Sequence, residues 1–132
     1  MKRGFACGVF DLYHPGHVLM LRECKKNCDY LIVALNSAKN LSPDKNKPVF
    51  TIEERKMVME STKYVDELLI YNSEEELLHI LKTTKIDIRF LGDDYKSKPV
   101  TGADLNIPIH HINRDHGYST SILIKKIIHV SK

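Results

Sequence analysis

Short apolar runs alternate with amphipathic stretches along the chain. Residues 5–7 form an apolar run that ends at Gly8, and residues 30–35 (Tyr-Leu-Ile-Val-Ala-Leu) form a longer one. Runs without polar alternation are typical of strands covered on both faces, as in a parallel sheet. Residues 16–27 lie between them and carry apolar side chains at helical spacing. This part of the chain therefore predicts a strand, helix, strand unit with a parallel crossover.

The alternation continues to the end of the chain. Two capping boxes, at 51–54 and 73–76, predict helices that run to about residues 62 and 84. The first of these helices is expected to face inward through Ile52, Met57, Val58 and Ser61. Further strands are predicted at 68–71, 86–91 and 107–112, and Pro108 limits the last one to a sheet edge or a strand start. A closing helix over 119–130 has one apolar side, made of Ile122, Leu123, Ile127 and Ile128.

Strands and helices that alternate throughout predict an α/β fold, a doubly wound five-stranded parallel sheet with right-handed crossovers. With 132 residues, 42% of them hydrophobic, the chain is expected to form one domain over 1–132. Its 20 Lys and Arg are mixed with 17 Asp and Glu. This balance lacks the basic stripe of a nucleic-acid interface, so no nucleic-acid partner is expected.

The chain also lacks the patterns of export and membrane insertion. The first ten residues do not have the apolar core of a signal peptide, and no stretch reaches the ~18 apolar residues of a membrane span. Three cysteines, at 7, 24 and 28, do not have the spacing of a disulfide framework. The expected location is the cytoplasm.

The unusual polar clusters all follow predicted strands. They occupy residues 10–17, 36–47, 92–95 and 114–121. In an open parallel sheet, ligands bind outside the carboxyl ends of the strands, where the strand order reverses. These four clusters are therefore the predicted site.

Two histidines stand out in the first cluster. His14 and His17 flank a Pro-Gly pair at the opening of a helix. Imidazoles at that position can donate hydrogen bonds to a phosphate, and the helix dipole adds to the attraction of an anion. Taken alone, the pair fits surface histidines equally well. A zinc site with Cys24 and Cys28 is a weaker alternative, because free cysteines commonly serve as small buried hydrophobes, and no resident metal site is predicted.

The decapeptide that runs from Gly8 to His17, Gly-Val-Phe-Asp-Leu-Tyr-His-Pro-Gly-His, closely resembles the signature of the cytidylyltransferase-like nucleotidyltransferases. Residues 55–60, 64–67, 91–95 and 114–121 resemble the glycerol-3-phosphate cytidylyltransferase branch, in the same order and at similar spacing. The resemblance covers essentially the whole chain. It implies a Rossmann-like fold and transfer of CMP from CTP to a small phosphorylated acceptor, with release of pyrophosphate and without a covalent enzyme intermediate.

The resemblance also implies roles for individual residues. The catalytic residues would be His14, His17, Lys45 and Lys47. The nucleotide would contact Val9, Phe10, Gly16, Asp94, Arg114, Ser119 and Thr120. The acceptor would contact Asp11, Arg55, Lys63 and Asp115. A triphosphate substrate implies Mg²⁺, bound mainly through phosphate oxygens and water. A homodimer is expected from the resemblance alone.

Several of these roles have structural alternatives. Asp11 could hold the acceptor or the 36–49 loop, and Ser119 could cap the closing helix. Lysines on the polar loop could be simply solvated, and Arg55 could be an exposed helical arginine.

The chain departs from the branch at positions that bear on the acceptor. Asp115-His116 replaces a common Thr-Glu pair, Lys63 replaces an arginine and Tyr95 a tryptophan. Lysine keeps the charge but loses the bidentate fork that suits a phosphate. The acceptor is therefore glycerol 3-phosphate or another phosphorylated polyol, amino alcohol or amino-acid derivative. An ATP-using adenylyltransferase of the same superfamily and a non-catalytic nucleotide-binding regulatory domain are the alternatives.

Overall fold

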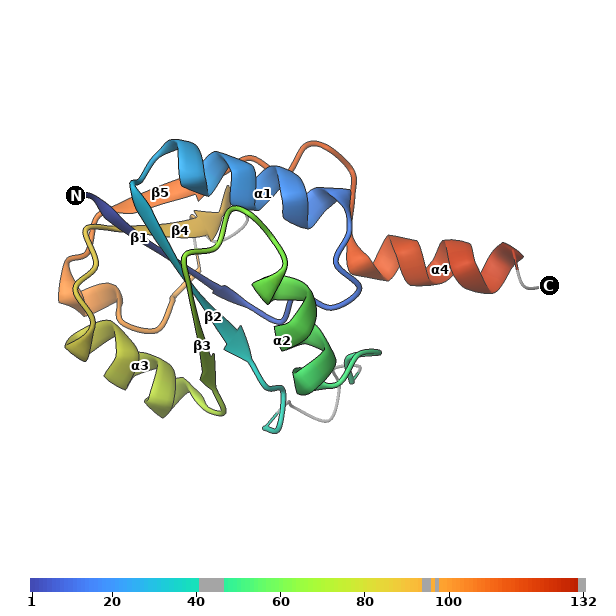
Figure 1. Ribbon diagram of the computed structural model, residues 1–132, viewed down its shortest axis with the longest axis horizontal. Helices are drawn as coiled ribbons and strands as arrows, with labels where there is room; N and C mark the ends of the chain where they lie inside the picture. The colour runs from blue at the N-terminus through green and yellow to red at the C-terminus, as the bar shows by residue number, and fades with distance from the viewer. Residues whose placement is uncertain (41–46, 94–95, 97, 131–132) are drawn as a thin grey trace.

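The computed structural model describes residues 1–40, 47–93, 96 and 98–130, and it confirms the predicted doubly wound sheet. Five parallel strands lie in the order β3-β2-β1-β4-β5 (Figure 1). The elements are β1 (Arg3–Gly8), α1 (Pro15–Lys26), β2 (Tyr30–Asn36), α2 (Ile52–Glu60), β3 (Glu67–Tyr71), α3 (Glu74–Thr83), β4 (Ile88–Gly92), the short 3₁₀ turn η2 (Ala103–Leu105), β5 (Ile109–Ile112) and α4 (Thr120–Val130).

The central strands β2, β1 and β4 are buried on both faces of the sheet, which explains their uninterrupted apolar runs. Alternate residues of β1 point to opposite sides: Ala6 lies in a cluster with Leu21 of α1 and Met59 of α2, whereas Phe5 lies in a second cluster with Leu77 of α3. β5 is an edge strand that begins directly after Pro108, as predicted. Within the described residues, no helix is long and apolar enough to cross a bilayer.

The inner face of α2 differs from the prediction. Met57 was expected to point inward, but its side chain is 72% exposed, and Ser61 is exposed as well. The buried residues of this helix are Arg55 and Met59, one turn apart. The prediction was wrong for Met57 and Ser61, whereas Ile52 does pack against the core. The sequence pattern did not show that an arginine occupies the inner face of the helix.

The helix caps are mostly as predicted. Thr51 and Glu54 form the expected reciprocal capping box. At the next helix, Ser73 accepts a hydrogen bond from the Glu76 N–H, but the Glu76 carboxylate accepts from the N–H of Asn72 instead of that of Ser73. This second capping box is therefore only half formed as predicted.

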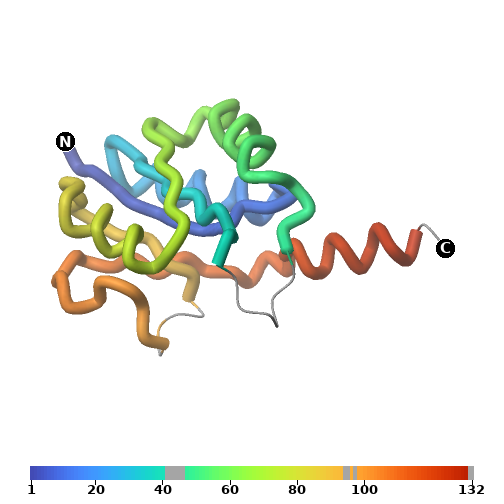
Figure 2. Tube along the Cα trace, turned by 90° about the horizontal axis from the view of Figure 1, so that it is seen from below, coloured from blue at the N-terminus to red at the C-terminus, as the bar shows by residue number. Residues whose placement is uncertain are grey.

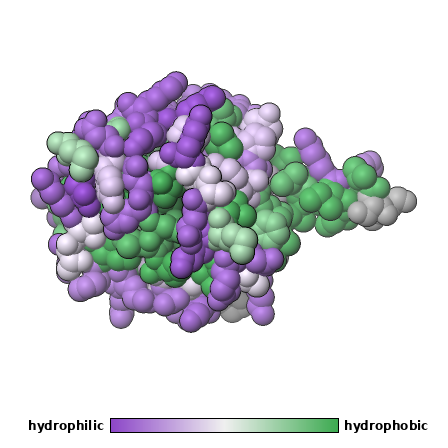
Figure 3. Space-filling model, in the orientation of Figure 1, coloured by the Kyte–Doolittle hydropathy of each residue, from purple (hydrophilic) through white to green (hydrophobic). Residues whose placement is uncertain are grey.

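The helix α4 leaves the body of the molecule instead of covering the sheet. It projects past the sheet and the other helices in both views (Figures 1 and 2). None of its residues from Thr120 to Val130 is buried, and its apolar side chains form a visible projection (Figure 3). The apolar side predicted for this helix is thus open to solvent.

Candidate active site

The predicted catalytic cluster lies where the strand order reverses. β1 is central, and its two neighbours, β2 and β4, precede connections that run in opposite directions across the sheet. The segment 9–17 leaves the carboxyl end of β1 at this switch point and leads into α1. Phe10 and Leu12 adopt positive φ angles of 52° and 51° there, which lets the chain turn tightly into the helix. This position is the usual ligand site of an open α/β sheet.

His14 and His17 form an unusual cap on α1. His14 is the N-cap residue, and its Nδ1 accepts a hydrogen bond from the N–H of Gly16 at 3.0 Å. His17 Nδ1 accepts from the backbone N–H of His14 at 3.1 Å, and the two ring centroids lie 3.9 Å apart. Together these bonds make a capping box built from two imidazoles. The sequence analysis predicted the pair as phosphate ligands but missed this second role.

The cap sets the tautomers of both rings. Because each Nδ1 accepts a hydrogen bond, the proton of each neutral imidazole lies on Nε2. The Nε2 of His14 is 3.2 Å from the Thr120 hydroxyl oxygen at the start of α4. The Thr120 hydroxyl in turn donates to the carbonyl of Asp11. The two predicted phosphate-binding segments, the starts of α1 and α4, therefore meet at one point.

Burial and nearby positive charge keep both histidines neutral. Burial first, and then the neighbouring His14 and Arg114, lower the pKa of His17 to about 4, an effect that Asp11 opposes. The pKa of His14 is lowered by burial first and then by His116 and Arg114. Neutral rings with an Nε2–H are hydrogen-bond donors for an anion, and they need no protonation to serve that role.

Gly16 is required by the packing of His14. A Cβ atom at this position would lie 2.8 Å from the His14 ring and 2.9 Å from the Cβ of Tyr118. A side chain here would push the ring away from its bond to the helix. The structure thus gives Gly16 a positioning role beside the nucleotide contact predicted for it.

The start of α4 is capped as the sequence suggested. The N–H of Ile122 donates to the Ser119 hydroxyl at 3.1 Å. The preceding loop holds Arg114 and Asp115, both exposed, and His116, whose Nδ1 accepts from the N–H of Tyr118. Arg114 and His116 act on the pKa of His14, so this loop lies within electrostatic reach of the cap.

Asp11 contacts the loop, which was one of the roles predicted for it beside binding the acceptor and fixing a turn. Its side chain is only 7% exposed, and its carboxylate accepts from the N–H groups of Val49 at 2.7 Å and Phe50 at 2.9 Å. These bonds tie the end of the polar 36–49 connection to the histidine segment. Lys47, exposed and two residues before Val49, is consequently anchored close to the site.

The prediction that Arg55 binds the acceptor is contradicted by its burial. The side chain is 2% exposed, and the guanidinium donates to four backbone carbonyls, those of Phe50, Val9, Asn36 and Ser37, at 2.6–3.2 Å. Burial lowers its pKa, an effect that the charge of Asp11 opposes. Arg55 therefore holds together the segments after β1 and β2 and the start of α2.

The remaining predicted residues lie in different places. Val9 and Phe10 are in the β1–α1 segment, where the Val9 carbonyl is taken by Arg55. Lys63 is on the α2–β3 connection, with its ammonium 5.4 Å from the centre of the Tyr64 ring. Lys45 and Asp94 lie outside the described residues.

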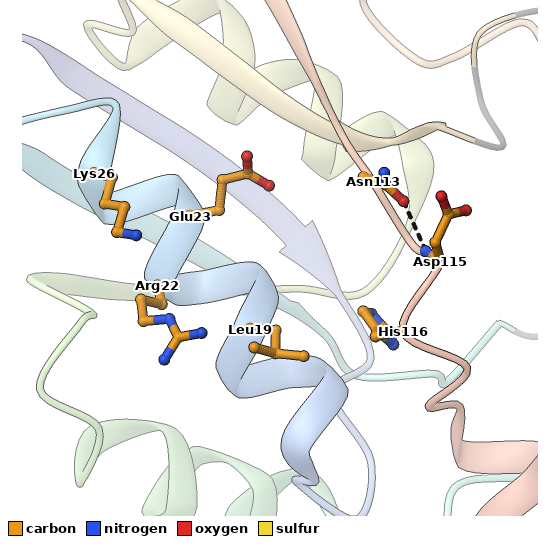
Figure 4. A pocket seen from close by; sticks show the side chains of 7 residues that line it. All are labelled: Leu19, Arg22, Glu23, Lys26, Asn113, Asp115 and His116. Atoms are coloured by element: carbon orange, nitrogen blue, oxygen red, sulfur yellow. Dashed lines mark hydrogen bonds between the residues drawn. The ribbon is translucent and has the colours of Figure 1, made fainter.

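A cavity of about 400 Å³ opens between α1 and the loop before α4. Figure 4 shows charged side chains of α1 on one side and those of the loop on the other. It is lined by Leu19, Arg22, Glu23, Lys26, Asn113, Asp115 and His116. Only Asp115 was predicted as a site residue. The missed signal is the pair Arg22 and Lys26, which are cations one turn apart on the first helix.

The geometry does not support a zinc site at α1. Cys24 is fully buried in the core, and the Cys28 thiol donates to the Cys24 carbonyl at 3.3 Å. Among the described residues, no three His, Cys, Asp or Glu side chains are grouped to hold a metal ion.

Comparisons with known proteins agree on one family for this chain. A family model described as cytidylyltransferase-like matches residues 5–126. The chain is 36% identical to the bifunctional protein HldE of Helicobacter pylori and to that of Campylobacter jejuni, over 93% of this chain in each case. It spans only 27% of the length of these relatives.

Solved structures agree with the fold. A lipopolysaccharide core biosynthesis protein from Thermoplasma volcanium superposes with a TM-score of 0.68 at 27% identity, covering 86% of this chain and 96% of that one. Pantothenate synthetase from Thermus thermophilus superposes with a TM-score of 0.57 at 11% identity, covering 86% of this chain and 55% of that one, which supports the fold alone.

Replacing Arg55 with methionine should destabilise the fold by about 3 kcal/mol or more, because it leaves four partly buried carbonyls without the donors of this buried guanidinium. Urea unfolding measures the loss. The matched control is Lys56→Met on the neighbouring exposed position, which should change the free energy of unfolding by less than about 0.5 kcal/mol. Equal small effects for the two variants would contradict the role assigned to Arg55.

The lowered pKa of His17 predicts a pH-dependent stability. An unfolded histidine binds its proton near pH 6.5, whereas folded His17 does so only near pH 4. The unfolded state takes up more protons in this window, so the free energy of unfolding should fall, by an amount on the order of 2–3 kcal/mol, as the pH falls through it. Urea unfolding across the window should show a shallower fall in His17→Gln than in the exposed control His79→Gln. Identical slopes would argue against a lowered pKa for the partly buried His17.

Proposed function

The chain belongs to the cytidylyltransferase-like family, and we propose that it transfers CMP from CTP to a small phosphorylated acceptor and releases pyrophosphate. The observation that supports this most directly is the junction of His14, His17 and Thr120 at the N-termini of two helices. Neutral imidazole Nε2–H groups, a threonine hydroxyl and two helix dipoles converge there. Such an arrangement suits a bound polyphosphate.

The proposed step is an in-line displacement. An oxygen of the acceptor phosphate attacks the α-phosphorus of the nucleotide, and the bond from that phosphorus to the departing pyrophosphate breaks. His14 and His17 donate hydrogen bonds to phosphate oxygens as negative charge develops, which lowers the barrier without any proton transfer. Their tautomers are already set by the helix cap, and the Nε2–H of His14 has only to exchange its bond to the Thr120 hydroxyl for one to a phosphate oxygen.

Other predicted residues complete the phosphate site in this proposal. Lys45 and Lys47 bring positive charge from the polar loop, whose end is tied to Asp11. Arg114 and Ser119 contact the nucleotide from the loop and cap before α4. The backbones of Val9 and Phe10, together with Asp94, contact its nucleoside part.

Mg²⁺ enters this proposal with the nucleotide as part of the substrate. Both carboxylate oxygens of Asp11 already accept backbone hydrogen bonds, and no cage of three ligands occurs in the described part of the chain. The triphosphate oxygens and water would therefore supply most of its ligands. Pyrophosphate release should accordingly depend on added Mg²⁺.

The cavity in Figure 4 supports a site for the acceptor. Arg22 and Lys26 offer cations for an acceptor phosphate, and Asp115 offers a carboxylate for hydroxyl or amino groups. Because Arg55 is buried, Arg22 and Lys26 take the acceptor-binding role that was predicted for it. Lys63 remains a candidate for that role. The similarity to a lipopolysaccharide core biosynthesis protein of Thermoplasma volcanium favours a sugar phosphate as one form of this acceptor.

Two other functions stand beside this proposal. The same site could serve ATP, because the choice of base depends on contacts that the phosphate site does not make. A domain that only binds nucleotide would not need histidines locked as donors beside a second helix start. The non-catalytic nucleotide-binding domain is therefore less well supported than the ATP-using enzyme.

The function is tested by measuring pyrophosphate release with Mg²⁺ and each of CTP, ATP, UTP and GTP, with and without glycerol 3-phosphate or a sugar phosphate. Release that needs CTP and an acceptor together is the expected result, and dependence on ATP would replace the proposed donor.

His17→Ala should lower kcat by roughly a hundredfold or more through lost transition-state stabilisation, whereas His79→Ala on α3 should not. Near-normal turnover in His17→Ala would exclude the role given to that ring.

A separate measurement tests the acceptor cavity. Arg22→Ala should raise KM for the acceptor by roughly tenfold or more and leave KM for the nucleotide nearly unchanged, because a charge-assisted hydrogen bond is lost. Lys82→Ala, which replaces an exposed lysine of α3, is the control and should change neither KM value. A rise confined to KM for the nucleotide would place the nucleotide in this cavity instead.

A further inference from the structure

A second buried arginine, Arg89 on β4, is less well paired than Arg55. Its side chain is 3% exposed, close to the 2% of Arg55. The Arg89 guanidinium donates from Nη1 to the carbonyl of Thr101, but its Nε is buried and has no hydrogen-bond partner. Among the described residues, no carboxylate forms an ion pair with it. Because a buried charge is costly unless it is paired, the charge of Arg89 is incompletely compensated in this part of the chain.

The side chains beside Arg89 lie on the face of the sheet opposite to α1. Cys7 of β1 and Tyr71 of β3 pack in the apolar cluster that includes Leu77 and Leu81 of α3. The helices α1 and α2 pack on the other cluster, across the sheet. Hydrogen bonding to Tyr71 and to Arg89 acts on the pKa of the Cys7 thiol, so these three side chains meet at one point.

The polar groups next to the guanidinium are neutral hydrogen-bond donors. Burial raises the pKa of the Cys7 thiol, an effect that the charge of Arg89 opposes. Burial also raises the pKa of the Tyr71 hydroxyl. The carboxylate of Glu74, at the start of α3, accepts a hydrogen bond from the Thr101 hydroxyl at 2.5 Å. A buried cation beside a thiol and a phenol, both protonated, suits an anionic ligand.

The carboxyl edge of the sheet gives access to this cluster. Cys7 and Gly8 at the end of β1 are partly exposed, and so are Gly92 and Asp93 at the end of the neighbouring strand β4. This edge is where an open α/β sheet binds its ligands. A small group that enters there can therefore reach the Cys7 thiol and, next to it, the guanidinium of Arg89.

We propose that Arg89, Cys7 and Tyr71 form a second anion site, which binds one carboxylate or phosphate group of a small molecule from the carboxyl edge of the sheet. The group accepts from the Nε–H of Arg89 and from the thiol or the hydroxyl, which compensates the buried charge. The site is separate from the histidine cap, because His14 lies on the α1 side of the sheet. Its occupation does not depend on the proposed nucleotidyl transfer.

Alkylation of the full chain by iodoacetamide, followed by peptide mass spectrometry, tests the site, with inorganic phosphate and acetate as probes. A bound anion should slow alkylation of Cys7 by roughly tenfold, because a negative charge beside a thiol raises its pKa and the thiolate is the reactive form. The effect should saturate, and chloride at equal ionic strength should not produce it. Alkylation of Cys28, which packs on the other face of the sheet, should not change. Protection by only one of the two probes would identify the group that the site binds, and protection by neither would overturn the proposal.

Two variants separate this site from the phosphate site at the histidine cap. Arg89→Met should abolish the protection of Cys7, whereas His17→Ala should retain it. Protection that persists in Arg89→Met, or that His17→Ala removes, would overturn the proposal. A rate of Cys7 alkylation that no anion changes would do the same, since a buried water would then satisfy the Nε–H.

Cys7→Asp tests the same charge without removing Arg89. Its carboxylate should take the place of the anion, so in chloride this variant should have a higher melting temperature than the matched control Cys7→Asn. Circular dichroism measures both melting temperatures. Equal values for the two variants would show that Arg89 does not lack an anionic partner.

Discussion

The buried guanidinium of Arg55 is the constraint on which the candidate site depends. A charge in the core is costly unless nearly all its donors are paired, and here four backbone carbonyls accept from it. Those carbonyls come from the chain after β1, the chain after β2 and the residue before the α2 cap. One side chain thus decides how three strand-end segments lie relative to each other.

The capping box of His14 and His17 lies on the segment after β1 that Arg55 holds, and it presents hydrogen-bond donors to a ligand. Each imidazole uses Nδ1 to hold the start of α1 and leaves Nε2–H as a donor. Because the Nδ1 atoms are committed to backbone N–H groups, protonation of either ring would break a cap bond, and burial further opposes it. The same contacts that stabilise the helix therefore keep the rings in the form that can donate to phosphate at neutral pH.

The sequence predicted much of the fold because its information is local. Apolar runs and capping residues located every strand and helix within a few residues, and Pro108 correctly placed β5 at the edge. The histidine segment was recognised from a contiguous motif. The role of Arg55 could not be recognised in this way, since its carbonyl partners lie up to 46 residues away in the chain. The inward prediction for Met57 was wrong for a related reason. A pattern of apolar residues cannot reveal that an arginine occupies the inner face of the helix.

A continuous set of hydrogen bonds joins the separate parts of the site. The Thr120 hydroxyl of α4 donates to the Asp11 carbonyl, and the Asp11 carboxylate accepts from Phe50, whose own carbonyl accepts from Arg55. The set runs from the projecting helix through the histidine segment to the end of the polar loop. Residues within this set support the geometry, so changes there should alter stability and turnover together.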